Sequence, residues 1–135
     1  MSKIFVDTSA WVALKDKSDK HNQKAIELNK ELLLNKNRYF TSNYIIDETL
    51  TLILMKLNHN TAIEFGEEIR NSKLIEIIYL DKELEEDSWQ FFKKYSDKNF
   101  SFTDCSSFII MKKFGIQKAF SSDHHFEQAG FIKLL

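Results

Sequence analysis

The sequence predicts an α/β domain with a central parallel sheet of four to five strands between two layers of helices. Short apolar segments rich in β-branched and aromatic residues alternate along the chain with longer amphipathic segments, the pattern of strands joined by crossover helices. The 135 residues include three glycines and no proline, and no stretch resembles an interdomain linker. We therefore expect residues 1–135 to form a single domain with one hydrophobic core.

The first half of the chain combines two predicted strands with four predicted helices. Ser42 or Asn43 should cap the third of these helices, which is apolar almost throughout and should therefore be central and buried on all sides. The predicted elements are a strand at 3–6, a short helix to about residue 16, a helix at 19–36, a strand at 38–42, a helix at 44–58 and a helix from about residue 60.

The second half continues the alternation. Asp81 should cap one helix, Thr103 or Asp104 should open the next, and Gly115 should end that helix from the C′ position. The predicted elements are a strand at 73–80, a helix at 82–96, a helix at 105–114, a strand at 117–121, a helical turn at 123–130 and a last strand at 131–135.

Composition bounds the function only loosely. The chain has 19 Lys and Arg against 20 Asp and Glu, a net charge of −1, so bulk charge favours no class of partner. No apolar stretch approaches the roughly 20 residues of a membrane span, and we expect no membrane association. Cys105 is the single cysteine, which excludes an intrachain disulfide and predicts a cytoplasmic protein.

Four acidic residues occur where predicted strands give way to helices. Asp7 ends the first strand, Glu48 lies one turn into the helix after the second, Asp104 stands at the start of a helix, and Asp123 follows the strand at 117–121. Each alone has a structural explanation, a helix cap for the aspartates and a salt bridge for Glu48. In a parallel sheet, however, all four junctions lie at one edge, where ligands collect.

Four converging carboxylates repel one another unless a cation neutralises them. Oxygen ligands favour Mg²⁺ or Mn²⁺ over zinc, and no spacing of Cys and His suggests a zinc site. Such a centre suits metal-assisted displacement at phosphorus, in which the ion activates water and stabilises the leaving oxygen.

Four segments resemble the PIN-domain ribonucleases, and among them the VapC-like toxins of toxin–antitoxin pairs: "FVDTSAW", "NYIIDETLTL", "FTDCSSFIIMKKFGI" and "AFSSDHHFEQAGF". They occur in the family's order and span residues 4 to about 132. The resemblance implies a PIN-like three-layer α/β/α fold. It also implies that Asp7, Glu48, Asp104 and Asp123 are catalytic acids that bind Mg²⁺ or Mn²⁺, supported by Thr8 and Ser121.

The sequence departs from the family pattern at one position. The family commonly has a second acid two residues after the last one, where this chain has His125. We expect His124 and His125 to lie in a solvated turn. Asp47 adjoins Glu48, but neighbours on a helix point about 100° apart, so one of them faces the site; the motif favours Glu48.

The resemblance implies an endoribonuclease that hydrolyses RNA phosphodiester bonds, leaving a 5′-phosphate and a 3′-hydroxyl, as the toxin of a pair with a cognate antitoxin. Two alternatives stay open: a housekeeping PIN nuclease of RNA maturation and an inert RNA-binding or scaffolding PIN module. A receiver domain is disfavoured, because it has an adjacent pair of acids near the N-terminus and "FVDTSA" lacks that pair. A haloacid-dehalogenase phosphatase is disfavoured as well, because it has a second aspartate two residues after the nucleophile, where this chain has Ser9.

The helices predicted at 44–58 and 60–72 carry more apolar side chains than one small sheet can cover. A leftover apolar face tends to become an interface, and two-fold pairing is the commonest closed arrangement. We therefore expect a homodimer with both acidic clusters along one groove, into which an antitoxin tail could insert.

Overall fold

The computed structural model describes residues 2–135, so of the predicted 1–135 domain only Met1 lies outside it. The strands are β1 (Lys3–Val6), β2 (Arg38–Ser42), β3 (Ile75–Ile78), β4 (Lys118–Phe120) and β5 (Ile132–Lys133). The helices are α1 (Thr8–Lys15), α2 (Asn22–Leu34), α3 (Asn43–Lys56), α4 (His59–Asn71), α5 (Lys82–Lys94), α6 (Phe102–Lys113) and α7 (His125–Gln128).

The five strands form one sheet in the order β3-β2-β1-β4-β5, and every neighbouring pair is parallel. This confirms the predicted parallel sheet, with five strands. β1 is central, and its residues Ile4, Phe5 and Val6 have no exposed surface, as expected of an apolar strand covered on both faces. Because Val6 pairs with Phe120, the chain leaves β1 and β4 at the same edge of the sheet.

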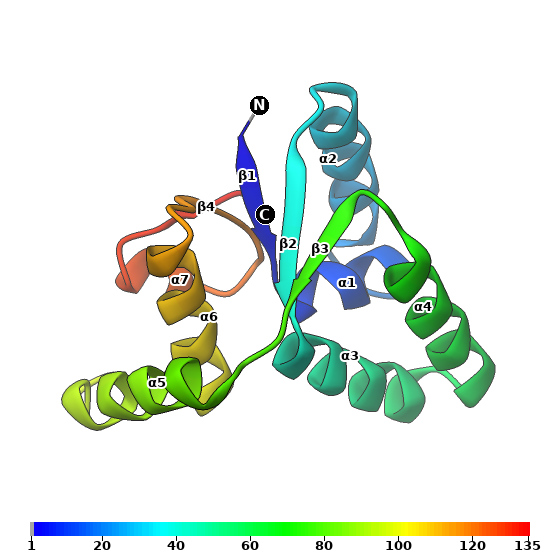
Figure 1. Cartoon of the computed structure of the whole chain (residues 1–135). Helices are drawn as coiled ribbons and strands as arrows, with labels where there is room; N and C mark the ends of the chain where they lie inside the picture. Colours follow the sequence, from blue (N-terminus) through cyan, green and yellow to red (C-terminus); the bar gives the residue numbers. More distant parts are fainter. Residues whose placement is uncertain (1) are drawn as a thin grey trace.

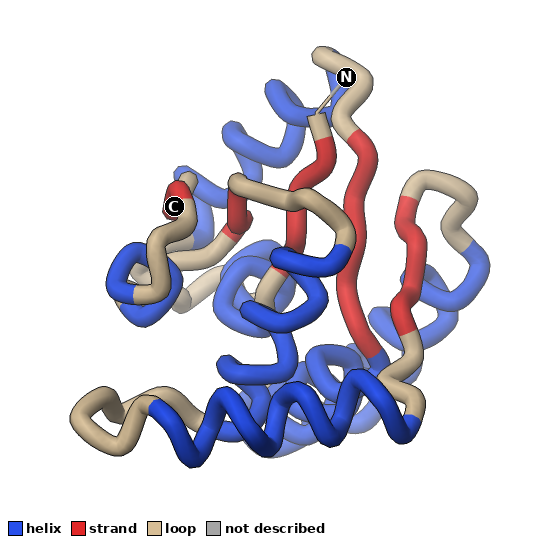
Figure 2. The backbone as a smooth tube through the Cα atoms, turned by 60° about the vertical axis from the view of Figure 1, so that its left-hand side comes forward, coloured by secondary structure: helices blue, strands red, loops and turns tan. Residues whose placement is uncertain are grey.

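Helices cover both faces of the sheet, which gives the predicted three-layer α/β/α arrangement. In Figure 1, α1, α2 and α4 lie to the right of the strands, and α5, α6 and α7 lie to the left. Figure 2 shows the strands side by side and helices crossing below their lower ends. Among residues 2–135, no helix has both the length and the apolar character that crossing a membrane requires.

The starts of α2 and α6 differ from those predicted, for reasons that the hydrogen bonds show. The Asp19 carboxylate accepts a 2.8 Å bond from the His21 backbone N–H, which forms a turn, and α2 begins after it. α6 is capped by Ser101 rather than by Thr103 or Asp104. Its hydroxyl accepts from the Asp104 N–H at 3.0 Å, and the Asp104 carboxylate accepts from the Ser101 N–H at 3.0 Å. This capping box places Asp104 inside the first turn, and Gly115 ends the helix as predicted, with φ +66°.

The helix α3 is not buried on all sides, which corrects the prediction for residues 44–58. Ile45, Ile46 and Ile53 are buried, on the side where α3 meets α1 and α4. On the opposite side, Leu54 is 49% exposed and Met55 is 77% exposed. The sheet and its helices are too small to cover both faces, so an apolar face stays open in the single chain.

Candidate active site

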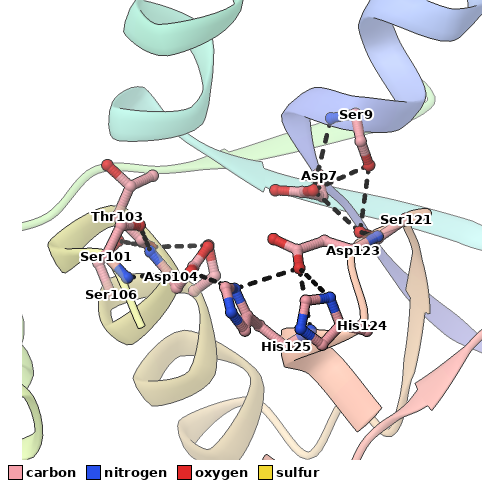
Figure 3. A network of polar contacts seen from close by, with 11 residues as sticks. Asp7, Ser9, Ser101, Thr103, Asp104, Ser106, Ser121, Asp123, His124 and His125 are labelled. Carbon is pink, nitrogen blue, oxygen red and sulfur yellow. Dashed lines mark hydrogen bonds and ion pairs between the residues drawn. The ribbon is translucent and has the colours of Figure 1, made fainter. Parts of the chain in front are cut away.

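Paired strands bring two of the predicted acids together. Asp7 follows β1 and Asp123 lies three residues beyond β4. The Asp7 backbone N–H donates a 3.1 Å bond to the carbonyl of Phe120, which continues the register of the sheet. Asp7 therefore leaves the sheet beside the segment that carries Asp123, and the two carboxylates face one another in Figure 3.

Two serines hold the carboxylate of Asp7. Its Oδ2 atom accepts a 3.0 Å bond from the Ser9 hydroxyl and a 2.9 Å bond from the Ser121 hydroxyl. The Ser9 backbone N–H lies 3.4 Å from the same atom, which makes Asp7 the N-cap of α1. Asp7 is therefore both the cap of α1 and a member of the acidic cluster (Figure 3).

Asp104 enters the cluster from the opposite side, on the first turn of α6. The Ser101 N–H fixes its Oδ2 atom through the capping box. The same Oδ2 atom lies 3.1 Å from Nδ1 of His125, and that nitrogen lies 3.2 Å from Oδ1 of Asp123. One imidazole nitrogen thus stands between two carboxylates (Figure 3).

The prediction of a solvated turn is correct for His124 and wrong for His125. The His124 side chain is 69% exposed, whereas that of His125 is 19% exposed. The His125 backbone N–H donates a 2.9 Å bond to Oδ1 of Asp123, and this tight turn carries the imidazole back toward the acids. The spacing of two residues between aspartate and histidine is the local signal that could have indicated such a turn.

Glu48 lines the same cleft as the three aspartates. The cleft has a volume of about 420 Å³, and Glu48 reaches it from α3, six residues after Ser42, the N-cap of that helix. Asp47, next to it, is exposed and does not line this cleft. The structure therefore brings all four predicted acids to one cleft, which Glu48 lines and Asp47 does not.

A larger groove of about 600 Å³ lies between α1, α2 and α4. Its walls are mainly apolar, with Trp11, Leu14 and Phe65 among them, and none of the four predicted acids lines it. This groove is larger than the acidic cleft, but the concentration of carboxylates makes the smaller cleft the candidate active site.

The electrostatics of the cleft call for a cation. Burial, and secondarily the charges of Asp104 and Asp123, raise the pKa of Asp7 to about 6, although the Ser121 and Ser9 hydrogen bonds act in the opposite direction. Burial also raises the pKa of Asp104, with Asp123 adding to the effect and His125 and the bonds to Ser101 opposing it. A divalent ion would stabilise both carboxylates in their charged form.

The oxygen atoms of the three aspartates are divided in the same way. In each, one oxygen accepts hydrogen bonds from the chain: Oδ2 in Asp7 and Asp104, and Oδ1 in Asp123. The other oxygen accepts none from residues 2–135. An oxygen anchored by the chain orients the carboxylate, and each carboxylate keeps a second oxygen that carries no hydrogen bond. The donor set fits a hard divalent cation.

A profile of the PIN domain matches residues 4–132. The chain belongs to the PIN-domain family. Among curated relatives, it is 35% identical over 132 residues to the 23S rRNA-specific endonuclease VapC20 of Mycobacterium tuberculosis, a match that covers 97% of each chain. It is 31% identical over 124 residues to a VapC ribonuclease of Archaeoglobus fulgidus, covering 90% of this chain and 78% of that protein.

Solved structures agree with this assignment. The crystal structure of M. tuberculosis VapC20, described as a sarcin-ricin loop cleaving toxin, superposes with a TM-score of 0.88 at 34% identity and covers 97% of this chain and 98% of its own. FitAcB from Neisseria gonorrhoeae shares the fold, with a TM-score of 0.72 at 16% identity over 98% of this chain and 96% of that one. These matches confirm the PIN fold implied by the sequence motifs.

Within this PIN domain, the two supporting residues behave differently. Ser121 is fully buried and bonds to Asp7; its hydroxyl also accepts the Asp123 N–H at 3.0 Å, so it links two acids. The Thr8 hydroxyl instead lies 3.5 Å from the Ile45 carbonyl and 3.3 Å from the Thr49 hydroxyl. Thr8 therefore ties α1 to α3, although it also lines the cleft.

Sequence reasoning missed Ser9 as well as His125. The Ser9 hydroxyl donates to Asp7 and accepts the Ser122 N–H at 3.0 Å, and it lies 3.1 Å from the Ser121 hydroxyl. Ser9 and Ser121 together lock the ends of β1 and β4 around the carboxylate. A hydroxyl two residues after an aspartate that ends a strand is an Asx-type signal, which the sequence carried.

Proposed function

We propose that this PIN protein is a metal-dependent endoribonuclease and the toxin of a toxin–antitoxin pair. The observation that carries the proposal is the convergence of Asp7, Glu48, Asp104 and Asp123 on one cleft. The relatives at 31–35% identity are named as VapC nucleases, which favours a toxin over a housekeeping nuclease. The complete set of acids favours an enzyme over an inert scaffolding module.

In this proposal the four acids bind Mg²⁺ or Mn²⁺. The bound ion would act as a Lewis acid toward the scissile phosphate and make its water more acidic. Asp7 is oriented by Ser9 and Ser121, and Asp104 by its capping box, so the ligands are positioned before RNA arrives. One carboxylate accepts a proton from the attacking water, and hydrolysis leaves a 5′-phosphate and a 3′-hydroxyl.

Two other groups in the cleft suit an RNA substrate. Lys56, from the end of α3, and Asn99 both line it. A lysine can neutralise a phosphate next to the scissile one, and an amide can donate to a phosphate or a 2′-hydroxyl. We propose 23S rRNA as the substrate, because the name of the VapC20 relative specifies that RNA and the two chains match over nearly their whole lengths.

The partners and location follow from the same proposal. A toxin requires a cognate antitoxin, and we propose that the chain is held inactive by one and acts in the cytoplasm, where ribosomal RNA is found. Co-purification with the product of a small neighbouring reading frame, followed by loss of nuclease activity, would support the pairing. An active nuclease that is unaffected by that product would argue for the RNA-maturation alternative.

Cleavage of ribosomal RNA tests the function. The purified full-length chain is incubated with intact ribosomes and with protein-free 23S rRNA, in Mg²⁺, in Mn²⁺ and in EDTA, and the ends are mapped by primer extension. We expect a discrete cut with a 5′-phosphate that depends on the metal. Intact RNA under all conditions with metal would contradict the proposal, and cleavage of other RNAs alone would retain the enzyme but refute the substrate.

A further inference from the structure

The Nδ1 atom of His125 occupies an unusual position in the cleft. It is the one buried side-chain nitrogen or oxygen among residues 2–135 that lacks a hydrogen-bond partner. Asp104 and Asp123 lie only 3.1 and 3.2 Å away, but neither contact has the angular geometry of a hydrogen bond. A buried polar atom without a hydrogen-bond partner is destabilising, so the position of this nitrogen calls for a functional explanation.

The imidazole of His125 is held in place from two sides. Its backbone N–H is bonded to Asp123 at 2.9 Å. Its ring meets the ring of Phe100 edge-to-face, with centroids 5.5 Å apart and an interplanar angle of 83°, and Phe100 is itself buried. The ring therefore cannot easily turn toward solvent, and Nδ1 stays directed at the two carboxylates (Figure 3).

His124 is far more exposed than its neighbour, although its ring packs against that of His125 with centroids 4.4 Å apart. Its side chain is 69% exposed, and its Nδ1 atom lies 3.8 Å from Oδ1 of Asp123. The side-chain donor atoms of Asp123, His124 and His125 come within 4.8 Å of one another, close enough for a shared ion. The mostly exposed His124 side chain is less restrained than that of His125, which Asp123 and Phe100 already orient.

We propose that Nδ1 of His125 is a nitrogen ligand of the divalent ion that Asp104 and Asp123 bind. This inference rests on the proposed function, in which those carboxylates hold the ion. To coordinate, the imidazole is neutral and carries its proton on Nε2, leaving the Nδ1 lone pair for the metal. A fixed ligand that needs no reorientation loses little entropy on binding.

A nitrogen ligand changes the metal that the centre selects. Carboxylate and water oxygens suit Mg²⁺, but imidazole nitrogen is a poor partner for Mg²⁺ and a good one for first-row transition metals. A centre of mixed oxygen and nitrogen ligands should therefore bind Mn²⁺ more tightly than Mg²⁺. We expect His125 to set this preference, because the other predicted ligands are all carboxylates.

Pulsed electron paramagnetic resonance of bound Mn²⁺ tests the ligand directly. The full-length chain is loaded with substoichiometric MnCl₂, and the modulation from a coordinated ¹⁴N is recorded. We expect the modulation in the native chain, its loss in His125→Gln, and its retention in His124→Gln and in His59→Gln, a control on α4 away from the cleft. Circular dichroism and thermal melts establish that each variant is folded, and His125→Asn provides a second replacement.

Calorimetric titration with MnCl₂ and MgCl₂ gives an independent readout. We expect His125→Gln to weaken Mn²⁺ binding by about 10-fold or more and to change Mg²⁺ binding less. His125→Asp should bring the affinities for Mn²⁺ and Mg²⁺ closer together. Equal losses for both metals would overturn the proposed selectivity.

The outcomes separate this inference from the proposed function. Bound Mn²⁺ without ¹⁴N modulation would overturn the nitrogen ligand and leave the carboxylate centre intact. Loss of the modulation in His124→Gln but not in His125→Gln would overturn the assignment to His125. A folded native chain that binds neither metal would overturn both the inference and the metal centre of the proposed function.

Discussion

The hydroxyl of Ser121 donates a 2.9 Å hydrogen bond to Oδ2 of Asp7, joining the ends of two parallel strands that are far apart in sequence. Both residues are buried. The bond orients the Asp7 carboxylate, and the same hydroxyl accepts the N–H of Asp123. The sheet register therefore does more than build a core, since it sets the positions of two of the acids of the proposed centre.

Replacement of Ser121 tests this link. Ser121→Ala removes the bond to Asp7 and leaves the Asp123 N–H without its acceptor, so we expect a loss of about 1–3 kcal/mol in unfolding free energy and Mn²⁺ affinity lower by about 10-fold. Chemical denaturation and calorimetric titration measure the two effects. Ser88→Ala is the matched control, because the buried Ser88 hydroxyl donates a 2.7 Å bond to the Leu84 carbonyl on α5 and does not line the cleft. Mn²⁺ affinity equal to that of Ser88→Ala would refute the link.

The raised pKa of Asp7 predicts an unusual dependence of stability on pH in the metal-free chain. The carboxyl group has a pKa of 3.8 in the unfolded chain and, mainly because of burial, about 6 in the folded chain. Between these values the folded chain binds more protons than the unfolded one, so this group's contribution to stability falls as pH rises from about 4 to 6. Above pH 6 the full cost is about 3 kcal/mol.

Asp7→Asn removes that cost. In EDTA, we expect the variant to be more stable than the native chain at pH 7, by up to about 3 kcal/mol, and to match it near pH 4. Added Mn²⁺ should stabilise the native chain and not the variant. Asp16→Asn is a control for which we expect the opposite effect on stability, because the pKa of Asp16 is lowered, first of all by its hydrogen bonds to Ser18. If Asp7→Asn were less stable than the native chain at pH 7, the electrostatic account of the cleft would be wrong.

The open apolar face predicts a homodimer. Leu54 and Met55 on α3 and Ile63 on α4 are each between 48% and 77% exposed, and pairing would bury them. Sedimentation at micromolar concentration should show twice the 16.0 kDa chain mass. Leu54→Glu should shift the equilibrium to the monomer, whereas Leu34→Glu, at an 81% exposed position on α2, should not. A native chain that sediments as a monomer would refute the dimer.

Neighbouring acids on α3 provide a test of Glu48. Glu48 lines the cleft, whereas Asp47 is exposed and does not line it. We expect Glu48→Gln to lower RNA cleavage by at least about 10-fold, as loss of a metal contact does, and Asp47→Asn to leave it within a factor of two to three of the native rate. Equal effects of the two substitutions would show that general surface charge, rather than position in the cleft, controls activity.

Sequence alone identified the features that depend on local pattern. Apolar runs located the strands, and the order of Asp7, Glu48, Asp104 and Asp123 after them predicted that the four acids converge, because parallel strands end at one edge. The turn around Asp123 was harder to predict. Whether the His125 ring faces solvent depends on the packing of Phe100, which lies distant in sequence, so only the tertiary structure could place it.

The cap of α6 and the exposed apolar face of α3 also depend on tertiary packing, which local sequence does not predict. Ser101, Thr103 and Asp104 are all good capping residues, and the choice of Ser101 depends on where α6 must start to pack against α5. The composition of α3 predicted burial, but the number of neighbours available in so small a domain decides which side is covered. Local sequence therefore predicts that these segments are helices, whereas tertiary packing decides where each helix begins and which of its sides is buried.

The rate of metal-dependent RNA cleavage by Asp104→Asn tests the central claim most directly. The substitution removes one charge from the cluster, keeps the size of the side chain and retains an oxygen to accept the Ser101 N–H, so the fold should persist. With Mg²⁺ or Mn²⁺, we expect cleavage at least about 100-fold slower than in the native chain, with a melting temperature of the metal-free protein that is equal or higher. Cleavage by folded Asp104→Asn at the native rate would contradict the assignment of this cleft as the catalytic centre.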